Sequence, residues 1–493
     1  MRLLDGLAAW SKDPSVSASE LWPSTNPTLR LQLACLTLIT VLAAALRMLR
    51  LTSQGLYADE GFSAHLGRTN VAGFAATVWD SELNMVAYYA LLRLWMHLGH
   101  SEFIIRLLSV LIGTATVPAI YFVSRRLFSD PWTALGASLL LAVHPFHLTL
   151  SQSARSYSLV VLLVTLASLY FLRAMQDATW GNWIAYAVSS AAAVYSHFFA
   201  LLVLFAHAVS LLFVPPHRLP WKRLLAGAGL LIVFLLPVGF FLLHHRDGGN
   251  LAWVAPFNRQ QVIYALYSLT LSKQRSLTYI AAWIVSVGSA VTLSRERAWP
   301  YRFTTIWLVV PVIVTVLASA FRPMLVERFL AVSIPAGVLL VAAGIVIISH
   351  WSRWIGPAVL VLIVFYSFST IRHYLWHPEY SENWKEASAY LLANAQNGDE
   401  VVIPPYPSVG VFDYYRERFP GKLPALVRAY SAEAPLPTPT PQSVWFIGPV
   451  VTMENWGIAP FLRAHQGMYC ALPPQPNWGS IRTWQFRRCP ADD

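Results

Sequence analysis

Long apolar runs recur along most of the chain and are separated by short polar stretches. A helix that crosses a membrane needs about 20 consecutive apolar residues. Eleven runs approach or reach this length, so the pattern predicts an α-helical polytopic membrane protein with about eleven transmembrane helices. The predicted spans are 29–49, 103–123, 132–150, 156–174, 181–196, 198–214, 223–243, 277–293, 303–320, 329–349 and 354–371.

The short loops between these spans form two alternating sets of unequal charge. One set holds ten Lys and Arg residues, and the other holds three. Because cytoplasmic loops of membrane proteins collect basic residues, the first set is expected in the cytoplasm, together with the N-terminus. The long connections 50–102 and 244–276 then lie outside. We expect the chemistry on that face, since long loops often hold a binding site or a lid.

After about residue 373 the pattern changes to that of a small soluble domain. Short apolar runs alternate with amphipathic stretches and with Pro-rich or Gly-containing turns, which is typical of an α/β fold. The chain is therefore divided into a transmembrane domain, 1–373, and an extracytoplasmic α/β domain, 374–493. The predicted elements of the second domain are helices at 384–394 and 409–419 and strands at 400–403, 443–447 and 481–486.

Composition supports the membrane class. Hydrophobic residues make up 56% of the chain and charged residues only 12%, which is about half the charged fraction of ordinary soluble domains. This excludes a disordered chain and argues against a soluble enzyme. The net charge of +11 follows from the basic cytoplasmic loops, so the expected partner is the lipid bilayer and not nucleic acid.

The chain contains three cysteines. Cys35 lies within the first span and is expected to pack there. Cys470 and Cys489 both fall in the predicted external domain, where an oxidising compartment permits a disulfide. The sequence leaves that pairing open because spacing does not supply the geometry. No Cys and His spacing resembles a zinc site.

Two adjacent acids, Asp59 and Glu60, follow the first span and are flanked by Tyr57 and Phe62. A carboxylate at the water–lipid boundary is partly desolvated and is therefore a stronger base than one in water. Such a group can deprotonate a hydroxyl while the membrane presents a lipid substrate. A structural interpretation is also open, in which Asp59 caps a helix over 60–70.

A second polar group lies further along the same connection. Asp80 and Glu82 precede the aromatic pair Tyr88-Tyr89, and carboxylates beside aromatic rings suit the binding of a polyhydroxyl group. The alternative is a run of charges that only solvates the loop.

Basic and imidazole side chains mark other outer turns. Arg155 begins the fourth span, where a guanidinium can bind phosphate through two parallel hydrogen bonds or can simply reach toward the headgroups. His197 lies at the next outer turn, and Arg328 precedes the tenth span. Basic groups outside run against the topology rule, so they serve an anionic ligand or attract lipid headgroups.

Taken in order, these motifs resemble those of the GT-C membrane glycosyltransferases, in particular the bacterial relatives of the dolichyl-phosphate-mannose–protein mannosyltransferases. The resemblance runs from about Leu31 to Gly344 and continues more weakly into the external domain. The motifs that carry it are Tyr57-Ala-Asp-Glu60, Tyr88-Tyr89 with Ser101-Glu-Phe-Ile-Ile-Arg-Leu107, His144-Pro-Phe-His147 with Ser151-Gln-Ser-Ala-Arg-Ser-Tyr157, Tyr195-Ser-His-Phe-Phe199 and Glu327-Arg-Phe-Leu330.

The resemblance implies transfer of a sugar, a hexose such as mannose or a pentose, from a polyprenyl-phosphate donor on the extracytoplasmic face. The acceptor is a protein, a lipid or a polysaccharide. Asp59 takes the position of the family's general base, and Glu60 would orient it or bind the acceptor. Arg155 and Arg328 match positions that bind the donor phosphate, and Tyr157 and His197 are expected to line the substrate site.

One departure concerns the stretch before the aromatic pair. Many relatives carry His-Pro-Pro-Leu-Tyr-Tyr where this chain reads Asn84-Met-Val-Ala-Tyr-Tyr89, so the His is absent. No cofactor or metal is expected, because guanidinium groups can neutralise a leaving monophosphate.

Three other functions fit the sequence less well than sugar transfer. A lipid-glycan transporter or flippase would place ionisable groups near the membrane midplane and show paired halves, and neither feature is found in the sequence. A scaffold that only presents the external domain would leave the outer acids without a role. An oligosaccharyltransferase with a diphosphate donor is a related enzyme that would need a metal and a larger external domain.

Overall fold

The computed structural model describes most of the chain, and its contacts divide it into two units. The described residues are 27–245, 254, 256–271, 275–377, 382–404, 408–419, 426–429, 440–450, 453–465, 467–473 and 476–489. Unit 1 consists of the described parts of Met1–Leu46, Ile112–Leu148 and Leu159–Ser367, and unit 2 of those of Arg47–Leu111, Thr149–Ser158 and Phe368–Asp493. Residues 246–253, 255 and 272–274 of the predicted outer connection 244–276 lie outside the described residues.

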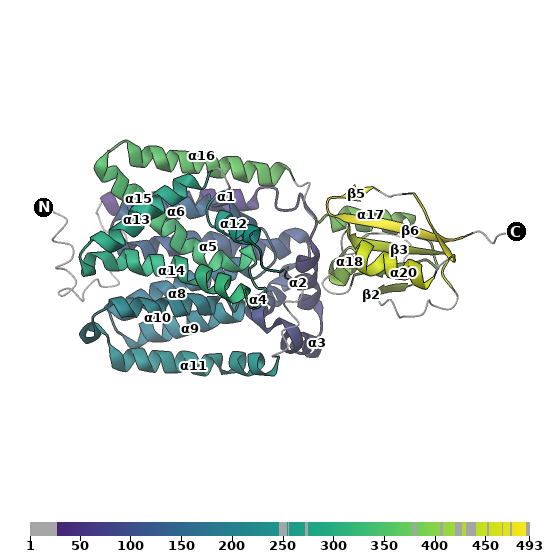
Figure 1. Ribbon diagram of the computed structural model, residues 1–493, viewed down its shortest axis with the longest axis horizontal. Helices are drawn as coiled ribbons and strands as arrows, with labels where there is room; N and C mark the ends of the chain where they lie inside the picture. Colours follow the sequence, from purple (N-terminus) through teal and green to yellow (C-terminus); the bar gives the residue numbers. More distant parts are fainter. Residues whose placement is uncertain are drawn as a thin grey trace. The chain divides into compact units, whose positions relative to one another are not determined.

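Each of the eleven apolar runs forms a helix (Figure 1). These helices are α1 (Pro27–Met48), α5 (Glu102–Phe128), α6 (Pro131–Ala142) with α7 (Pro145–Ser151), α8 (Tyr157–Gln176), α9 (Trp180–Ser196), α10 (Ala200–Ser210), α11 (Trp221–His244), α13 (Leu277–Thr292), α14 (Arg295–Ser319), α15 (Ile334–Trp351) and α16 (Ile355–Trp376).

Seven helices in the described part of the chain are long and apolar enough to cross a membrane, and the bent pair α6–α7 raises the number to eight. These seven spans correspond to the helices α1, α5, α8, α11, α14, α15 and α16. The remaining three helices, α9, α10 and α13, are shorter, with 17, 11 and 16 residues. The class of helical polytopic membrane protein is thus confirmed, while the number of eleven spans stays a prediction.

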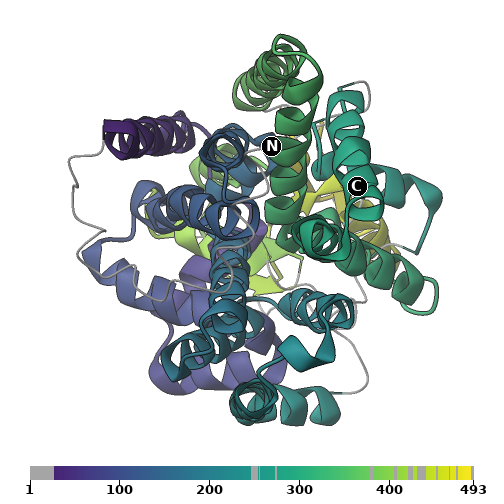
Figure 2. The same ribbon diagram turned by 90° about the vertical axis from the view of Figure 1, so that its left-hand side faces the viewer.

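The helices of unit 1 form a bundle, seen from its end in Figure 2. Helix α15 is buried along most of its length and packs against α13. A Cβ added at Gly344 would lie only 2.2 Å from the carbonyl oxygen of Ala282, so the two backbones approach closely. Trp283 Nε1 donates to Gly337 O at 2.9 Å. Small residues and interhelical hydrogen bonds hold helices together where lipid removes the hydrophobic driving force.

The predicted span 132–150 is not one straight helix. It consists of α6 and α7, which meet at an angle of 59°. Pro145 causes the break because it disfavours the helical conformation of the residue before it and lacks an N–H donor. The buried His144 at this bend accepts a hydrogen bond on Nδ1 from the backbone N–H of His147, at 3.3 Å.

The outer connection 50–102, predicted only as a long loop, is mostly helical. It contains α2 (Ala58–Arg68), α3 (Val71–Thr77), α4 (Val86–Trp95) and the short turns η3 (Val78–Glu82), η4 (Leu83–Met85) and η5 (Met96–Leu98). Tyr57 is the N-cap of α2, and Asp59 lies inside its first turn. The interpretation of Asp59 as the cap of a helix over 60–70 is therefore wrong. Asp59 instead adds negative charge to the first turn, where the helix dipole favours it.

The C-terminal region contains a six-stranded mixed sheet with the order β2-β1-β3-β6-β4, and β5 also pairs with β6. The strands β2, β1 and β3 are parallel, whereas β3, β6 and β4 are antiparallel. The elements are α17 (Trp384–Asn394), β1 (Glu400–Ile403), α18 (Ser408–Arg416), β2 (Leu426–Ala429), β3 (Ser443–Pro449), η11 (Met453–Ile458), α20 (Ala459–Ala464), β4 (Tyr469–Ala471), β5 (Asn477–Trp478) and β6 (Ile481–Arg488).

All five elements predicted in this region are confirmed. The additional pieces β2, β4, β5, η11 and α20 are short, and pattern arguments work poorly on so few residues. Alternate residues of β3 and β6, such as Phe446 and Phe486, pack on Phe461 of α20. Cys470 and Cys489 form a disulfide with their Cα atoms 5.1 Å apart, which settles the pairing that the sequence left open.

Candidate active site

Asp59 and Arg155 come together in unit 2. The nearest carboxylate oxygen of Asp59 lies 4.0 Å from Arg155 Nε, and Arg155 Nη1 also contacts the Asp59 backbone carbonyl at 3.4 Å. The side chain of Arg155 is 9% exposed and that of Asp59 is 25% exposed. A carboxylate that solvent reaches therefore lies beside a nearly buried cation, in a region where water screens their charges only weakly.

Glu60 has a different role from its neighbour. It is fully buried, and its carboxylate accepts hydrogen bonds from Arg106 Nε at 2.9 Å and Arg106 Nη2 at 2.5 Å. It also accepts from the backbone N–H of Ala154 at 2.8 Å and from that of Tyr57 at 3.3 Å. These four bonds tie the segment that carries Asp59 to the segment that carries Arg155. The burial of Glu60 and its four bonds favour the predicted role of orienting Asp59 over that of binding an acceptor.

Arg106 completes this buried centre. Besides Glu60 it donates to the backbone carbonyls of Leu51, Gln54 and Gly55 at 2.7–2.8 Å. The turn before α2 thus wraps around one guanidinium. Sequence reasoning quoted Arg106 within a motif and gave it no role. The sequence does contain a signal for this role, because an arginine inside an apolar span needs a partner of opposite charge.

The second polar group joins the same site through Tyr89. Its hydroxyl donates to Glu82 Oε2 at 2.8 Å and accepts from Arg155 Nη1 at 2.9 Å. The guanidinium also lies 5.9 Å from the Tyr89 ring centre, a cation–π contact. Glu82, Tyr89, Arg155 and Asp59 therefore form a continuous chain of polar contacts. Asp80 is exposed and no contact places it in this chain.

Two further tyrosines lie beside these residues. The Tyr57 hydroxyl is hydrogen-bonded to Ser153 Oγ. Burial, reinforced by the negative charge of Glu60, raises the pKa of Tyr57 well above its ordinary value, so its phenol stays protonated. Tyr88 is buried, and its hydroxyl bonds to Ser109 Oγ at 2.8 Å. Burial likewise raises the pKa of Tyr88. The aromatic pair thus splits into one ring that contacts Arg155 and one that packs.

The C-terminal elements of unit 2 also hold the turn that carries Asp59. Glu382 Oε2 accepts a hydrogen bond from the backbone N–H of Ala58 at 2.9 Å, and the Tyr415 hydroxyl accepts from that of Leu56 at 2.6 Å. Tyr415 donates in turn to Glu102 Oε1 at 2.9 Å. Sequence reasoning missed these residues, because no local pattern links a side chain to a backbone amide more than 300 residues away.

The remaining predicted site residues are placed as follows. Tyr157 is buried at the start of α8 in unit 2, two residues after Arg155. His197 and Arg328 belong to unit 1. There the buried His197 ring packs on Phe199 and Phe329, with ring centres 5.5 and 4.8 Å apart, and Arg328 is half-buried. Within the described residues, no group of three or more His, Cys, Asp and Glu side chains is arranged to hold a metal ion.

Comparisons with known proteins extend this description. A family model for dolichyl-phosphate-mannose-protein mannosyltransferases matches residues 85–241. The structure is similar to ArnT from Cupriavidus metallidurans in the apo state, at 14% sequence identity and a TM-score of 0.59, covering 91% of this chain and 97% of that chain. The same protein bound to undecaprenyl phosphate matches at 13% identity, with the same TM-score and coverage.

A third similar structure is the Archaeoglobus fulgidus oligosaccharyltransferase in its apo form. It matches at 13% identity with a TM-score of 0.55, covering 89% of this chain and 73% of that chain. Sequence comparison with curated proteins finds no match. The predicted resemblance is confirmed, and the chain has the fold of the GT-C membrane glycosyltransferases.

Proposed function

We propose that this protein transfers a sugar from a polyprenyl-phosphate donor to an acceptor hydroxyl or amine, with Asp59 as the general base. The observation that carries the proposal is the pairing of the partly exposed Asp59 with the nearly buried Arg155. A base and a phosphate-binding cation are the two groups that such a transfer requires. The fold supports the donor class, because a protein of similar structure binds undecaprenyl phosphate.

The proposed reaction is a single displacement. A carboxylate oxygen of Asp59 takes the proton of the acceptor, and the acceptor atom forms a bond to C1 of the sugar. The bond between C1 and the phosphate oxygen breaks, and its electron pair stays on the departing polyprenyl phosphate. Because the acceptor attacks from the side opposite the leaving group, the anomeric configuration is inverted. The sugar is proposed to be a hexose, such as mannose, or a pentose.

Arg155 is proposed to stabilise the phosphate as its charge grows. A guanidinium has five N–H donors in a planar fork, so Arg155 can keep its bond to Tyr89 and still bind phosphate oxygens. The low exposure of its side chain strengthens this interaction, since little water competes. Within unit 2, Tyr157, Asp80 and Glu82 are proposed to line the substrate site, while the roles of Arg328 and His197 in unit 1 stay predictions from the family motifs.

We propose that the site and the C-terminal domain lie on the extracytoplasmic side, with the N-terminus in the cytoplasm of a bacterial inner membrane. The distribution of Lys and Arg in the short loops supports this orientation. The disulfide Cys470–Cys489 supports it independently, because disulfides persist in oxidising compartments. The acceptor would then be a protein, lipid or polysaccharide of the cell envelope.

The test is sugar transfer from radiolabelled polyprenyl-phosphate sugars by the purified protein in lipid nanodiscs. We expect transfer by the wild type and a loss of about a hundredfold or more in Asp59→Asn, in the range that removal of a general base produces. Asp177→Asn is the matched control, because Asp177 is an exposed acid of unit 1 that has no role in the proposed reaction. Full activity of Asp59→Asn would exclude Asp59 as the base.

A further inference from the structure

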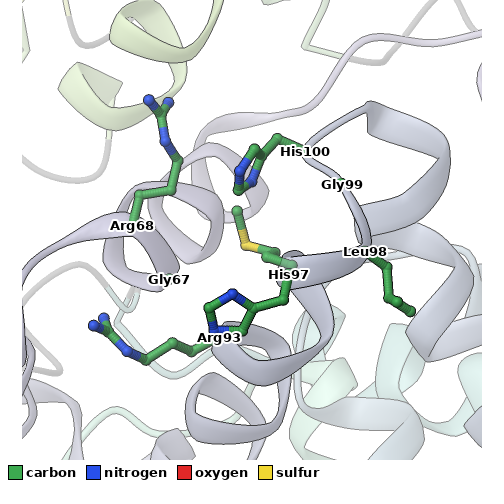
Figure 3. Close-up of a pocket in the computed structure, with 8 residues that line it drawn as sticks. Gly67, Arg68, Arg93, His97, Leu98, Gly99 and His100 are labelled. Atoms are coloured by element: carbon green, nitrogen blue, oxygen red, sulfur yellow. The ribbon is translucent and has the colours of Figure 1, made fainter.

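Unit 2 contains a pocket that takes no part in the proposed mechanism. It has a volume of about 470 Å³ and is lined by Gly67, Arg68, Arg93, Met96, His97, Leu98, Gly99 and His100 (Figure 3). These residues come from the end of α2, the last turns of α4 and the segment around η5. We refer to it as the basic pocket.

Four of the eight lining side chains are basic and none is acidic. Arg68 Nη1 pairs with Glu417 at 2.6 Å, and Arg93 Nη1 donates to the backbone carbonyl of Thr69 at 2.5 Å. Each of these bonds uses one of the five N–H donors of a guanidinium, so they hold the side chain in place and leave donors for a ligand. The imidazoles of His97 and His100 add two more donors on exposed side chains.

The backbone shapes this pocket through two glycines. Gly99 has a φ of +144°, a conformation that other residues rarely adopt, and it lies between the two histidines. Figure 3 shows the imidazole rings of His97 and His100 directed into the space between this turn and α2. A Cβ added at Gly67 would lie 2.7 Å from Met96 Sδ, so the Met96 side chain packs closely against α2 at this glycine.

A purely structural explanation covers only part of this arrangement. Basic residues in the last turn of a helix stabilise it by interacting with the helix dipole, and Arg68 and Arg93 lie in the last turns of α2 and α4. That explanation does not account for His100, which lies beyond the end of η5, or for a cavity of this size. A smaller pocket that shares Arg68 is lined by Asp413 and Glu417, so these acidic residues belong to that pocket and do not line the basic pocket.

We propose that the basic pocket binds a phosphate group, through Arg93, His97 and His100 with support from Arg68. Gly67 follows Asp59 by eight residues in the same helix, which corresponds to about 12 Å along the helix axis. A short glycan can span this distance. The pocket would therefore anchor a phosphorylated acceptor, a role that rests on the proposed function. The binding of phosphate itself does not depend on catalysis.

The test measures binding separately from transfer. Glucose 6-phosphate and glucose are titrated into the full-length protein in phosphatidylcholine nanodiscs, and phosphorus and proton NMR line broadening report binding. We expect glucose 6-phosphate to bind and glucose not to bind. The variant with His97→Gln and His100→Gln should bind at least about tenfold more weakly, as should Arg93→Gln. Arg93→Gln also removes the bond to the Thr69 carbonyl and can weaken the fold. The histidine variant avoids this problem, because both histidines are exposed.

Two controls keep the outcomes distinct. Arg126→Gln removes an exposed arginine of unit 1 and should leave binding unchanged. Asp59→Asn should bind glucose 6-phosphate normally while losing transfer, which separates failure of the pocket from failure of the proposed function.

A second experiment distinguishes a lipid headgroup from a phosphorylated glycan as the natural ligand. Nanodiscs that contain phosphatidylglycerol should abolish the binding of glucose 6-phosphate if the natural ligand is a lipid headgroup, and should leave it intact if the ligand is a phosphorylated glycan. Both results support a phosphate site. Absence of glucose 6-phosphate binding in phosphatidylcholine nanodiscs, or equal binding by wild type and the histidine variant, would overturn it.

Discussion

The buried pair of Glu60 and Arg106 permits a strong test of how this site is built. The substitution Glu60→Gln keeps the size of the side chain and removes its charge. In the wild type, Glu60 Oε1 accepts from Arg106 Nε and from the backbone N–H of Ala154, and Oε2 accepts from Arg106 Nη2. An amide nitrogen cannot accept a hydrogen bond, so the variant loses acceptors on at least one side.

The expected loss of folding stability follows from the burial of both side chains. The Glu60 side chain is 0% exposed and that of Arg106 is 6% exposed, so the guanidinium is left without its counter-charge in a region of low dielectric. Removing one partner of a buried ion pair costs about 3–5 kcal/mol. The lower value corresponds to a factor of more than about a hundred in the folding equilibrium. Transfer should fall as well, since the segments bearing Asp59 and Arg155 are no longer joined.

The assay combines thermal unfolding of the purified protein in nanodiscs with the transfer reaction. The double variant with Glu60→Gln and Arg106→Gln should recover part of the stability lost by the single variant, because no unpaired charge then stays buried. Glu386→Gln is the matched control, since Glu386 is an exposed glutamate of the same unit and takes no part in the candidate site. Unchanged unfolding and transfer in Glu60→Gln would refute the role of Glu60 as the centre of the site.

Three further predictions follow from other contacts. Tyr415→Phe removes the acceptor for the backbone N–H of Leu56 and should lower kcat severalfold with little change in the donor KM, which steady-state kinetics would check. Gly61→Ala should destabilise the protein by about 1–3 kcal/mol, because the new Cβ would lie 2.2 Å from that of Val411, whereas Gly181→Ala has open space and should have no such effect in thermal unfolding. Cys470→Ser should lower the stability of the C-terminal domain by about 3 kcal/mol, and a reducing agent should bring the wild type to the same unfolding temperature. An unfolding temperature of the wild type that does not respond to reduction would contradict the last prediction.

Local patterns were sufficient for much of the fold. Each of the eleven apolar runs is helical, with the run 132–150 divided into two helices, because an apolar stretch of span length has few other stable states in a membrane. The helix at 384–394 and the strands at 400–403, 443–447 and 481–486 were predicted for a similar reason, since periodicity and turn residues act over a few positions. Where a local rule was overlooked, as with Pro145 inside the span 132–150, the prediction was wrong in detail.

Prediction from the sequence was less complete for the candidate site. Motif resemblance singled out Asp59, Glu60, Tyr89 and Arg155, and the chemistry of acids beside aromatic rings singled out Glu82. The structure brings Asp59, Glu82, Tyr89 and Arg155 into one set of contacts. The resemblance assigned the general base to Asp59 and left two roles open for Glu60, which would orient Asp59 or bind the acceptor. Asp59 and Glu60 are adjacent in sequence, yet successive residues of a helix point in directions about 100° apart, so one side chain is partly exposed and the other is fully buried.

The sequence by itself determined the membrane class and the positions of the apolar helices, because these depend on composition and short-range pattern, and it predicted Asp59 and Arg155 as candidates for the chemistry. Only the tertiary structure decided that Glu60 pairs with Arg106, that Tyr89 joins Glu82 to Arg155, and that Tyr415 holds the turn before Asp59. The partners in these contacts are up to 359 residues apart. The packing of distant helices selects among many possible charge and hydrogen-bond partners, and no local pattern records that choice.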